Sequence, residues 1–418
     1  NGNQVLTFVR ENKVKLSLTM IIKNESRCIE RCLKAIIPYV DMVVLCDTGS
    51  TDGTLEICKA WEDRKFFHVF SIPWEKDFSK ARNHALELAE NLGATAHIAL
   101  DADEEFVEES DKKSEGSRST EKKYVEKFVQ KGEGNVLHLT KDELETSIAT
   151  NSKIKNLLET ANKEHGKSWV CAFRERNFFY SEEGKIEEAI SEEQKIFTKG
   201  LRFSGKVHEQ VDFHGPRLRL PITFLHDGYL MKGKGSRNLE LLEEELKQNP
   251  EDAYLHYQIA TTLQKEKEKD RALYYFQKFL EYLPEEELES PYGKEGIIQY
   301  LYLVMDLNRE ELYQEAMDLV YTLGQDGRKK VMEQSADYHF ALGLFYMKYI
   351  AKEPESRLSL LPAIEKQFLH CLSIGEENRK EGTVGTASYK AHHNLSLYYE
   401  FIGDKEKAKK ELEEARKQ

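Results

Sequence analysis

The 418-residue chain lacks several features that would assign its class directly. No apolar run approaches the roughly 18 residues of a membrane span, and no signal-like segment opens the sequence, so we expect a soluble, cytoplasmic protein. The six cysteines show neither a CxxC pair nor zinc-ligand spacing, which favours reduced core residues. Basic residues are not in excess: the net charge is -13, which argues against general nucleic-acid binding.

What is present is a globular composition arranged in two parts. Hydrophobic residues make up 40% and charged residues 32%, and the length favours at least two domains. Residues 16–106 alternate apolar runs with amphipathic helical segments, which is typical of a doubly wound parallel α/β sheet. We therefore expect an α/β domain at 1–235, with a polar insertion at about 107–166, and an all-α domain at 236–418.

The expected elements follow from hydrophobic periodicity and helix caps. We expect strands at 16–22, 42–46, 66–72 and 96–100, then at 169–180, 195–199, 201–213 and 222–229, and helices at 26–37, after Gly53 and from about Ser79. A loop at 231–238 closes this half. In such folds ligands bind beyond the carboxyl ends of the strands.

The second half repeats itself. Small and large apolar residues around 253–286 fit a 34-residue tetratricopeptide unit, and the same pattern recurs around 300–323, in a stretched unit at 342–363, and at 392–415. Four imperfect repeats predict an α-solenoid whose groove suits a peptide, although a homodimer through the repeats and a plain helical bundle are the alternatives. The polar C-terminus suits a cap.

An acidic cluster follows the expected strand at 96–100. Asp101 and Asp103, two residues apart on extended backbone, point to the same side and could together bind Mg²⁺ or Mn²⁺. A solvated acidic loop is the alternative interpretation of these two residues taken alone.

Three further polar segments support a nucleotide site: two directly follow expected strands, and the third lies at the start of an expected helix. Asp47 opens "DTGSTDGT", where it could accept hydrogen bonds from a base or ribose, and "KNES" and "KARN" supply polar groups and cations at helix starts that suit a pyrophosphate. The candidate nucleotide-binding residues are Asn24, Glu25, Asp47, Ser50, Lys80, Arg82, Asn83 and Asp101.

Together these pieces give residues 16–106 a clear resemblance. "IIKNES", "DTGSTDGT", "KARNHALELA" and "ALDADEEF" resemble, in order and spacing, the nucleotide-binding half of a family 2 glycosyltransferase of GT-A fold. The resemblance implies a GT-A, Rossmann-like domain that binds a UDP-sugar. It implies that Asp47 contacts the uracil, that Arg82 lies near the diphosphate, and that Asp103 binds the metal. It also implies that Asp101 helps to hold the nucleotide or the sugar.

The resemblance also extends to later residues. Many family 2 enzymes carry an acidic pair about a hundred residues past the DxD motif, and "HE" stands there in this chain, which suggests Glu209 as general base. His208 could orient Glu209 or face the sugar. His226 resembles the late histidine that completes the metal site of GT-A enzymes. A structural histidine remains an equal alternative at that position.

The whole chain resembles the bacterial peptide S-glycosyltransferases that modify glycocin precursors. This implies an inverting transfer of a hexose, with glucose expected, from a UDP-sugar to a Cys or Ser side chain of a peptide. A transferase acting on a cell-surface polysaccharide or lipid-linked sugar is one alternative. A catalytically inactive scaffold that only binds nucleotide and a partner is the other.

Overall fold

A computed structural model describes residues 13–62, 64–107, 154–166, 168–181, 184–207, 209–215, 217–230, 235–379 and 381–417. The chain divides into two compact units, Asn1–Met231 and Lys232–Gln418. The sequence placed this division at residue 235. Each unit is described by itself.

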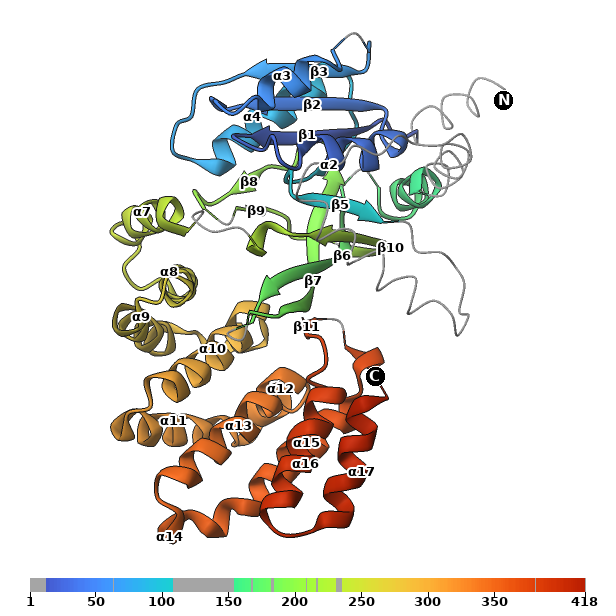
Figure 1. The fold of residues 1–418 in the computed structure, drawn as a ribbon. Helices are drawn as coiled ribbons and strands as arrows, with labels where there is room; N and C mark the ends of the chain where they lie inside the picture. Colours follow the sequence, from blue (N-terminus) through green and yellow to red (C-terminus); the bar gives the residue numbers. More distant parts are fainter. Residues whose placement is uncertain are drawn as a thin grey trace. The chain divides into compact units, whose positions relative to one another are not determined.

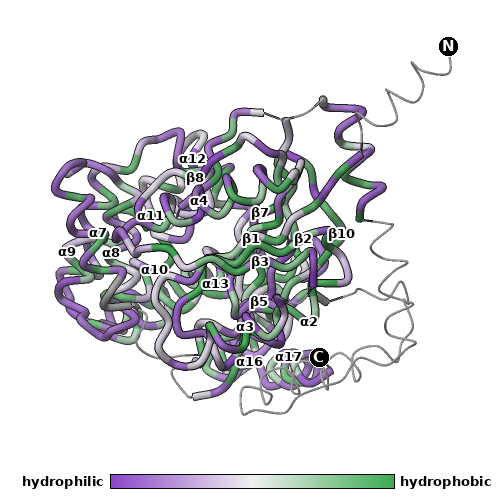
Figure 2. The backbone as a smooth tube through the Cα atoms, turned by 90° about the horizontal axis from the view of Figure 1, so that it is seen from above, coloured by the Kyte–Doolittle hydropathy of each residue, from purple (hydrophilic) through white to green (hydrophobic). Residues whose placement is uncertain are grey.

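The first half of the N-terminal unit is a parallel sheet, as the sequence predicted. Its strands are β1 (Leu16–Ile22), β2 (Met42–Asp47), β3 (Phe67–Ser71) and β4 (Ala96–Ala99), in the order β3-β2-β1-β4. They are connected through α2 (Ile29–Ile36), the 3-10 turn η1 (Ile37–Tyr39), α3 (Thr54–Lys59) and α4 (Phe78–Asn91). Every residue of β2 is buried, as expected for a strand covered on both faces, and Figure 2 shows the backbone at β1, β2 and β3 in the colour of hydrophobic residues.

The sheet continues with strands of both directions. β5 (Glu104–Val107), β6 (Val170–Tyr180), β7 (Ile186–Thr198) and β10 (Arg217–His226) extend it in the order β4-β7-β6-β10-β5. β7 runs antiparallel to both β4 and β6. The strand expected at 195–199 therefore starts earlier, at Ile186. The strand expected at 201–213 is instead two short paired strands, β8 (Phe203–Ser204) and β9 (Gln210–Val211).

The end of the expected polar insertion belongs to the core. Residues 154–165 form a helix, and Ile154, Leu158 and Ala161 are buried in the main hydrophobic cluster of the unit. Three apolar residues at helical spacing account for this packing. Residues 108–153 of the insertion lie outside the described residues.

The C-terminal unit consists of antiparallel helix pairs (Figure 1). The four pairs that correspond to the predicted repeats are α8 (Ala253–Lys265) with α9 (Lys269–Tyr282), α10 (Pro291–Leu307) with α11 (Glu310–Leu323), α13 (Ala336–Lys352) with α15 (Leu361–Ile374), and α16 (Tyr389–Phe401) with α17 (Lys405–Arg416). The short helix α14 (Pro354–Arg357) lies inside the third pair and explains why that repeat is stretched, whereas α12 (Asp326–Met332) lies between the second and third pairs. The prediction of a loop at 231–238 is wrong for residues 235–238, because α7 (Gly235–Leu246) begins at Gly235.

Three expectations about the whole chain can be compared with the structure. All six cysteines are free and buried, which confirms their assignment to the core. No residue of α17 is buried, as suits a terminal cap. Among the described helices, none has the length and apolar character needed to cross a bilayer.

The close packing of α13 on α15 gives a stability prediction. A Cβ added at Gly343 would lie 2.7 Å from Cζ of Phe368, a side chain with no exposed surface. We expect Gly343→Ala to lower the free energy of unfolding by about 1–3 kcal/mol, because an overpacked core must shift. Chemical denaturation of the full chain measures this. Gly327→Ala in α12, where a Cβ meets nothing within 4 Å, is the matched control; equal stability of the two variants would contradict the prediction.

Candidate active site

The carboxyl ends of β1, β2 and β4 bring the predicted loops to one edge of the sheet. Ile22 and Asp47 are register partners at the ends of β1 and β2, and Thr48 N–H donates to the Ile22 carbonyl at 3.0 Å. Asp101 follows β4, the other neighbour of β1. The edge is therefore built as the parallel pattern predicts.

Several predicted nucleotide-binding residues hold these loops together. The Asp47 carboxylate, which is buried, accepts from the backbone N–H of Gly49 at 3.0 Å and of Ser50 at 3.1 Å. Asn24 N–H donates to Ser50 Oγ at 3.0 Å, and Asn24 Oδ1 accepts from Thr51 N–H at 2.8 Å. The Glu25 N–H donates to Thr54 Oγ1 at 2.7 Å. These contacts shape the two loops.

The start of α4 separates three residues that the sequence grouped. Asp77 caps the helix by accepting from Lys80 N–H, and the Lys80 ammonium reaches Glu75 in an exposed pair. Asn83 binds the backbone of Phe203 through both its amide nitrogen and its oxygen, at 3.0 and 2.8 Å. Only Arg82 of these three turns its side chain to the acidic edge.

Arg82 joins two of the predicted site residues. Its Nη2 donates to Asp101 Oδ1 at 2.7 Å, and its Nε donates to Glu209 Oε1. Glu209 follows Asp103 by 106 residues in the sequence. The shared contact with Arg82 places Glu209 beside Asp101 of the DxD motif. Arg82 Nη1 is buried without a hydrogen-bond partner.

The charges of this group stabilise one another. Desolvation disfavours the Arg82 cation, but Asp101 and Glu209 outweigh it and raise the pKa of Arg82 above its usual value. Desolvation likewise favours neutral Asp101, yet Arg82 and Lys195 lower the pKa of Asp101 below its usual range. Both groups therefore stay charged at neutral pH.

Lys195 on β7, which the sequence analysis missed, lies among four carboxylates. Its Nζ contacts Glu104 and lies 3.4 Å from Asp101 Oδ2. Although desolvation opposes it, these carboxylates with Glu175 and Glu193 raise the pKa of Lys195. Burial, followed by the charges of Glu193 and Glu104, raises the pKa of Glu175; burial also raises the pKa of Glu193, despite Lys195. One lysine thus offsets only part of this acidic cluster.

Asp103 and His226 face each other across the site. His226 Nε2 lies 3.6 Å from Asp103 Oδ1, and Asp103 is buried. The Asn177 amide nitrogen donates to Ser191 Oγ at 3.0 Å, which leaves Asn177 Oδ1, at 2.7 Å from His226 Nδ1, to accept from that nitrogen. His226 Nε2 is therefore directed at Asp103, and a partner on the other ring nitrogen is typical of metal-binding histidines.

The surroundings of His226 attract positive charge. Burial alone would lower its pKa, but the hydrogen bond to Asp103 and the charges of Glu175, Asp103 and Glu104 raise the pKa of His226 to about 9. A proton or a divalent cation at Nε2 relieves the mutual repulsion of these three carboxylates.

Gly228 allows both groups to pack closely against its backbone. A Cβ added there would overlap both His226 Nε2 and the Asp103 carboxylate. One carboxylate oxygen and one imidazole nitrogen 3.6 Å apart are a donor pair that suits a divalent cation. No cluster of three or more His, Cys, Asp or Glu side chains suited to a metal is found in the described part of the chain, so these two residues would be the protein ligands, while Asp101 is directed at Arg82 and Lys195.

The Gly228 contact gives a prediction. We expect Gly228→Ala to raise the Mn²⁺ concentration needed for half-maximal nucleotide binding by about 10–100-fold, because the new methyl group would push His226 Nε2 and the Asp103 carboxylate out of place. Metal titration of UDP binding measures this. Gly327→Ala is the control, because it adds a methyl group in open space. Gly184→Ala is less suitable, because Gly184 has a positive φ that strains any other residue. An unchanged metal requirement would contradict the prediction.

An arginine network that the sequence analysis missed supports the His226 loop. Arg27 donates to both carboxylate oxygens of Asp227 at 2.8 and 3.0 Å, and Arg31 donates to Asp227 at 3.0 Å. Arg31 also pairs with Glu105 at 3.1 Å. Asp227 N–H donates to the carbonyl of Asp103 at 3.3 Å. Arg27, in the turn before α2, and Arg31, in the first turn of α2, thus position the segments that carry Asp103 and His226. The four-residue spacing of the two arginines in "SRCIERC" was the available signal.

One predicted residue is not described. His208 lies outside the described residues, so its suggested role beside Glu209 stays a prediction. Tyr229, which follows Gly228 in the 3-10 turn η3 (Gly228–Leu230), packs edge-on against His226 with ring centroids 4.9 Å apart.

Comparison with known proteins identifies this part of the chain. Residues 17–114 match the family described as glycosyl transferase family 2. The N-terminal unit contains a family 2 glycosyl transferase domain. The match includes β1 to β5, so the loops after β1, β2 and β4 and both aspartates of the DxD motif lie inside it.

Curated relatives resemble the chain over short regions. A TPR repeat-containing protein of Synechococcus elongatus is 35% identical over 103 residues, 25% of this chain and 24% of the relative. The SPbeta prophage-derived glycosyltransferase SunS of Bacillus subtilis (strain 168) is 29% identical over 85 residues, 20% of each protein. The matched region spans a quarter or less of the length of these curated relatives.

Solved structures resemble the chain more loosely. TarS of S. aureus aligns with a TM-score of 0.32 and 12% identity, over 80% of this chain and 54% of TarS. MamA from Desulfovibrio magneticus RS-1, residues 41 to the end, aligns with a TM-score of 0.34 and 16% identity, over 44% of this chain and 86% of MamA. At these TM-scores the likeness decides nothing about the chain.

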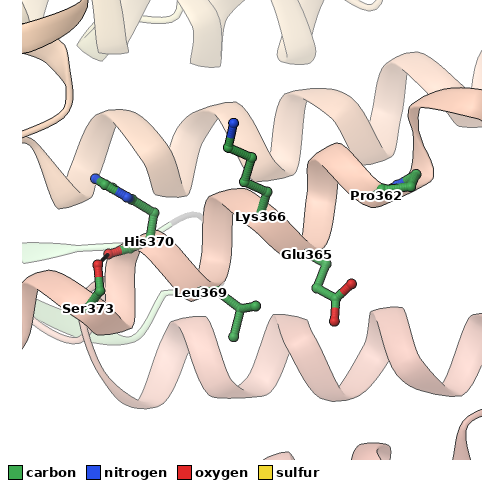
Figure 3. A pocket seen from close by; sticks show the side chains of 6 residues that line it. All are labelled: Pro362, Glu365, Lys366, Leu369, His370 and Ser373. Atoms are coloured by element: carbon green, nitrogen blue, oxygen red, sulfur yellow. Dashed lines mark hydrogen bonds between the residues drawn. The ribbon is translucent and has the colours of Figure 1, made fainter.

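The C-terminal unit contains a separate open hollow of about 500 Å³ along α15. It is lined by Pro362, Glu365, Lys366, Leu369, His370 and Ser373. Figure 3 shows Lys366 and His370 pointing to one side of the helix and Glu365 and Leu369 to the other. Because these side chains diverge, the hollow lacks the converging polar groups that are found in the glycosyl transferase domain. We therefore take the converging groups of that domain, and not this hollow, as the candidate active site.

Proposed function

We propose that the chain is an inverting glycosyltransferase that moves a hexose from a UDP-sugar to a Cys or Ser side chain of a peptide. The observation that carries this proposal is the convergence of Asp103, His226, Asp101, Arg82 and Glu209 beyond the carboxyl ends of the strands of a family 2 domain. Glucose is the expected sugar, from the resemblance to peptide S-glycosyltransferases.

Asp103 and His226 would hold a divalent cation, Mg²⁺ or Mn²⁺. When bound there, the cation would supply Lewis-acid charge to offset the negative charge of the departing UDP. Arg82 adds a second fixed cation to this edge, and its buried, unpartnered Nη1 is a remaining donor. The loops ordered by Asp47, Asn24 and Ser50 would form the base and ribose side of the site.

Glu209 would take the proton of the acceptor. Its carboxylate is fixed by Arg82 Nε, so its second oxygen has a defined position relative to Asp101. For a serine hydroxyl this proton transfer is required at neutral pH. A cysteine thiol with a free pKa of about 8.5 is already ionised to a few per cent, so it needs the base less.

The helical repeats would dock the peptide. Stacked repeats form concave surfaces that suit an extended or helical segment, which a transferase acting on a side chain needs nearby. Relatives that carry TPR repeats or the name glycosyltransferase support this combination over short regions. A homodimer through the same repeats is a separate expectation, which sedimentation analysis tests.

The test is to incubate the protein with UDP-glucose, UDP-galactose or UDP-N-acetylglucosamine, Mg²⁺ or Mn²⁺, and peptides that differ only in a Cys or Ser. The mass of a peptide is expected to rise by one sugar, and only with metal present. Unmodified peptides in every combination would overturn the peptide acceptor. Failure to release or transfer sugar to any acceptor, carbohydrates included, would overturn the enzyme assignment and favour a nucleotide-binding scaffold.

A further inference from the structure

A row of polar side chains continues from the metal pair along β6 and β7. We call Glu175, Asn177, Ser191 and Glu193 the polar row. Glu175 is the register partner of Ser191, and Asn177 and Glu193 lie two residues further along their strands on the same face. The row is continuous: Asn177 Nδ2 donates to Ser191 Oγ at 3.0 Å, and Ser191 Oγ donates to Glu193 Oε1 at 3.2 Å.

One end of the polar row contacts the proposed reaction centre, and a lysine near the other end reaches it. Asn177 Oδ1 lies 2.7 Å from His226 Nδ1, and Glu175 Oε2 lies 3.8 Å from the same nitrogen. Lys195, two residues beyond Glu193 on β7, reaches Asp101. A sugar attached to a diphosphate that a cation at Asp103 and His226 holds would lie near the row.

One atom of the row has an unmet hydrogen-bonding capacity. Glu175 is 4% exposed, and its Oε1 has no hydrogen-bond partner. A buried carboxylate oxygen without a donor costs free energy that a donor on a ligand would recover. The row as a whole offers carboxylate, amide and hydroxyl oxygens, the acceptors that bind the hydroxyl groups of a sugar.

An aromatic ring borders the same place. Tyr229 is 52% exposed and packs edge-on against His226. Its ring is a half-buried apolar surface on which the carbon face of a pyranose fits. The combination of acceptor oxygens and an exposed ring distinguishes this place from a purely electrostatic acidic cluster.

We propose that the polar row binds the hydroxyl groups of the transferred sugar and so selects which sugar nucleotide is used. This inference rests on the proposed function. Glu175 Oε1 accepts from one sugar hydroxyl and Glu193 from another, while Ser191 and Asn177 hold the two carboxylates in register. A sugar that lacks or inverts one of these hydroxyls leaves a buried oxygen unpaired and binds less well.

The test compares the binding of UDP with that of UDP-glucose, UDP-galactose and UDP-N-acetylglucosamine by calorimetry in Mn²⁺. We expect wild type to bind one UDP-sugar more tightly than UDP. In Glu175→Gln and Glu193→Gln this advantage should fall by about tenfold, while the Kd for UDP changes by less than about threefold. Glu192→Gln is the matched control, because Glu192 lies on the opposite face of β7 and pairs with Arg219.

Three outcomes would overturn the inference. The first is an equal loss of UDP and UDP-sugar affinity in both variants, which would assign the row to the metal or diphosphate. The second is an unchanged sugar advantage in both variants. The third is a rise of the peptide KM with donor binding intact, which would assign the row to the acceptor. Wild-type protein that fails to bind UDP at all would instead overturn the proposed function. Thermal unfolding verifies that each variant is folded, and the partly exposed Glu193 serves where Glu175→Gln does not fold.

Discussion

Replacing Asp103 by Asn is expected to lower sugar transfer by about a thousandfold, which corresponds to about 4 kcal/mol of transition-state stabilisation. Asn has nearly the shape of Asp but no charge, so it cannot offset a divalent cation between itself and His226. UDP binding should also lose its sensitivity to EDTA, because metal-assisted binding is what the substitution removes. The measurements are kcat/KM over a Mn²⁺ titration and the Kd for UDP with and without chelator.

The fold should survive this change. Asp103 is buried beside Asp101, Glu104 and Glu105, so removal of one negative charge relieves repulsion within the cluster. Asp212→Asn is the matched control, since the Asp212 side chain is 69% exposed and pairs only loosely with His214 at 3.8 Å. Activity of Asp103→Asn within tenfold of wild type, or unchanged sensitivity to EDTA, would contradict a metal role for this residue.

The first half of the sheet was predictable because its pattern is local. Each parallel strand is a short apolar run, each is followed by a polar loop, and parallel strands place such loops at one edge. This reasoning places Asp47 at the end of β2 and Asp101 just after β4, where the structure has them. It did not distinguish residues that bind ligand from those that shape the loop, since both types are Asn, Ser and Asp.

The start of α4 shows a second limit. Lys80, Arg82 and Asn83 were grouped because they are close in sequence, but successive residues of a helix point about 100° apart. Arg82 therefore faces Asp101 and Glu209, whereas Lys80 faces solvent and Asn83 faces the backbone of Phe203. Periodicity alone does not say which helical face meets the site.

The polar row and Lys195 could not be found from the sequence. β7 runs from Ile186 to Thr198, but the segment "SEEQK" within it is entirely polar, a pattern that predicts a loop and not a strand. The position of Lys195 in the site depends on the antiparallel pairing of β7 with β6 and β4. This pairing brings Lys195 next to Asp101, which is 94 residues away in the sequence. Polar strands of this kind are expected at binding sites, where local pattern and function conflict.

Replacing Glu209 by Gln is expected to separate the two possible acceptors. With a Ser peptide the rate should fall by about 10²–10⁴-fold, because the hydroxyl loses its general base. With the matched Cys peptide the rate should fall by less than about tenfold, because part of the thiol is already thiolate at neutral pH. The ratio of the two rates, measured at saturating UDP-sugar and metal, is the decisive quantity.

The comparison of two peptides removes the ambiguity of the Arg82 contact. Gln retains an oxygen that can accept from Arg82 Nε, but it no longer offsets the guanidinium charge, which alters the diphosphate side of the site for both peptides equally. Any effect of that kind cancels in the Cys-to-Ser ratio, whereas loss of proton transfer does not. Glu87→Gln, at an exposed position of α4, provides the control. Equal residual rates on the two peptides would show that Glu209 acts through Arg82 and that the base is another group.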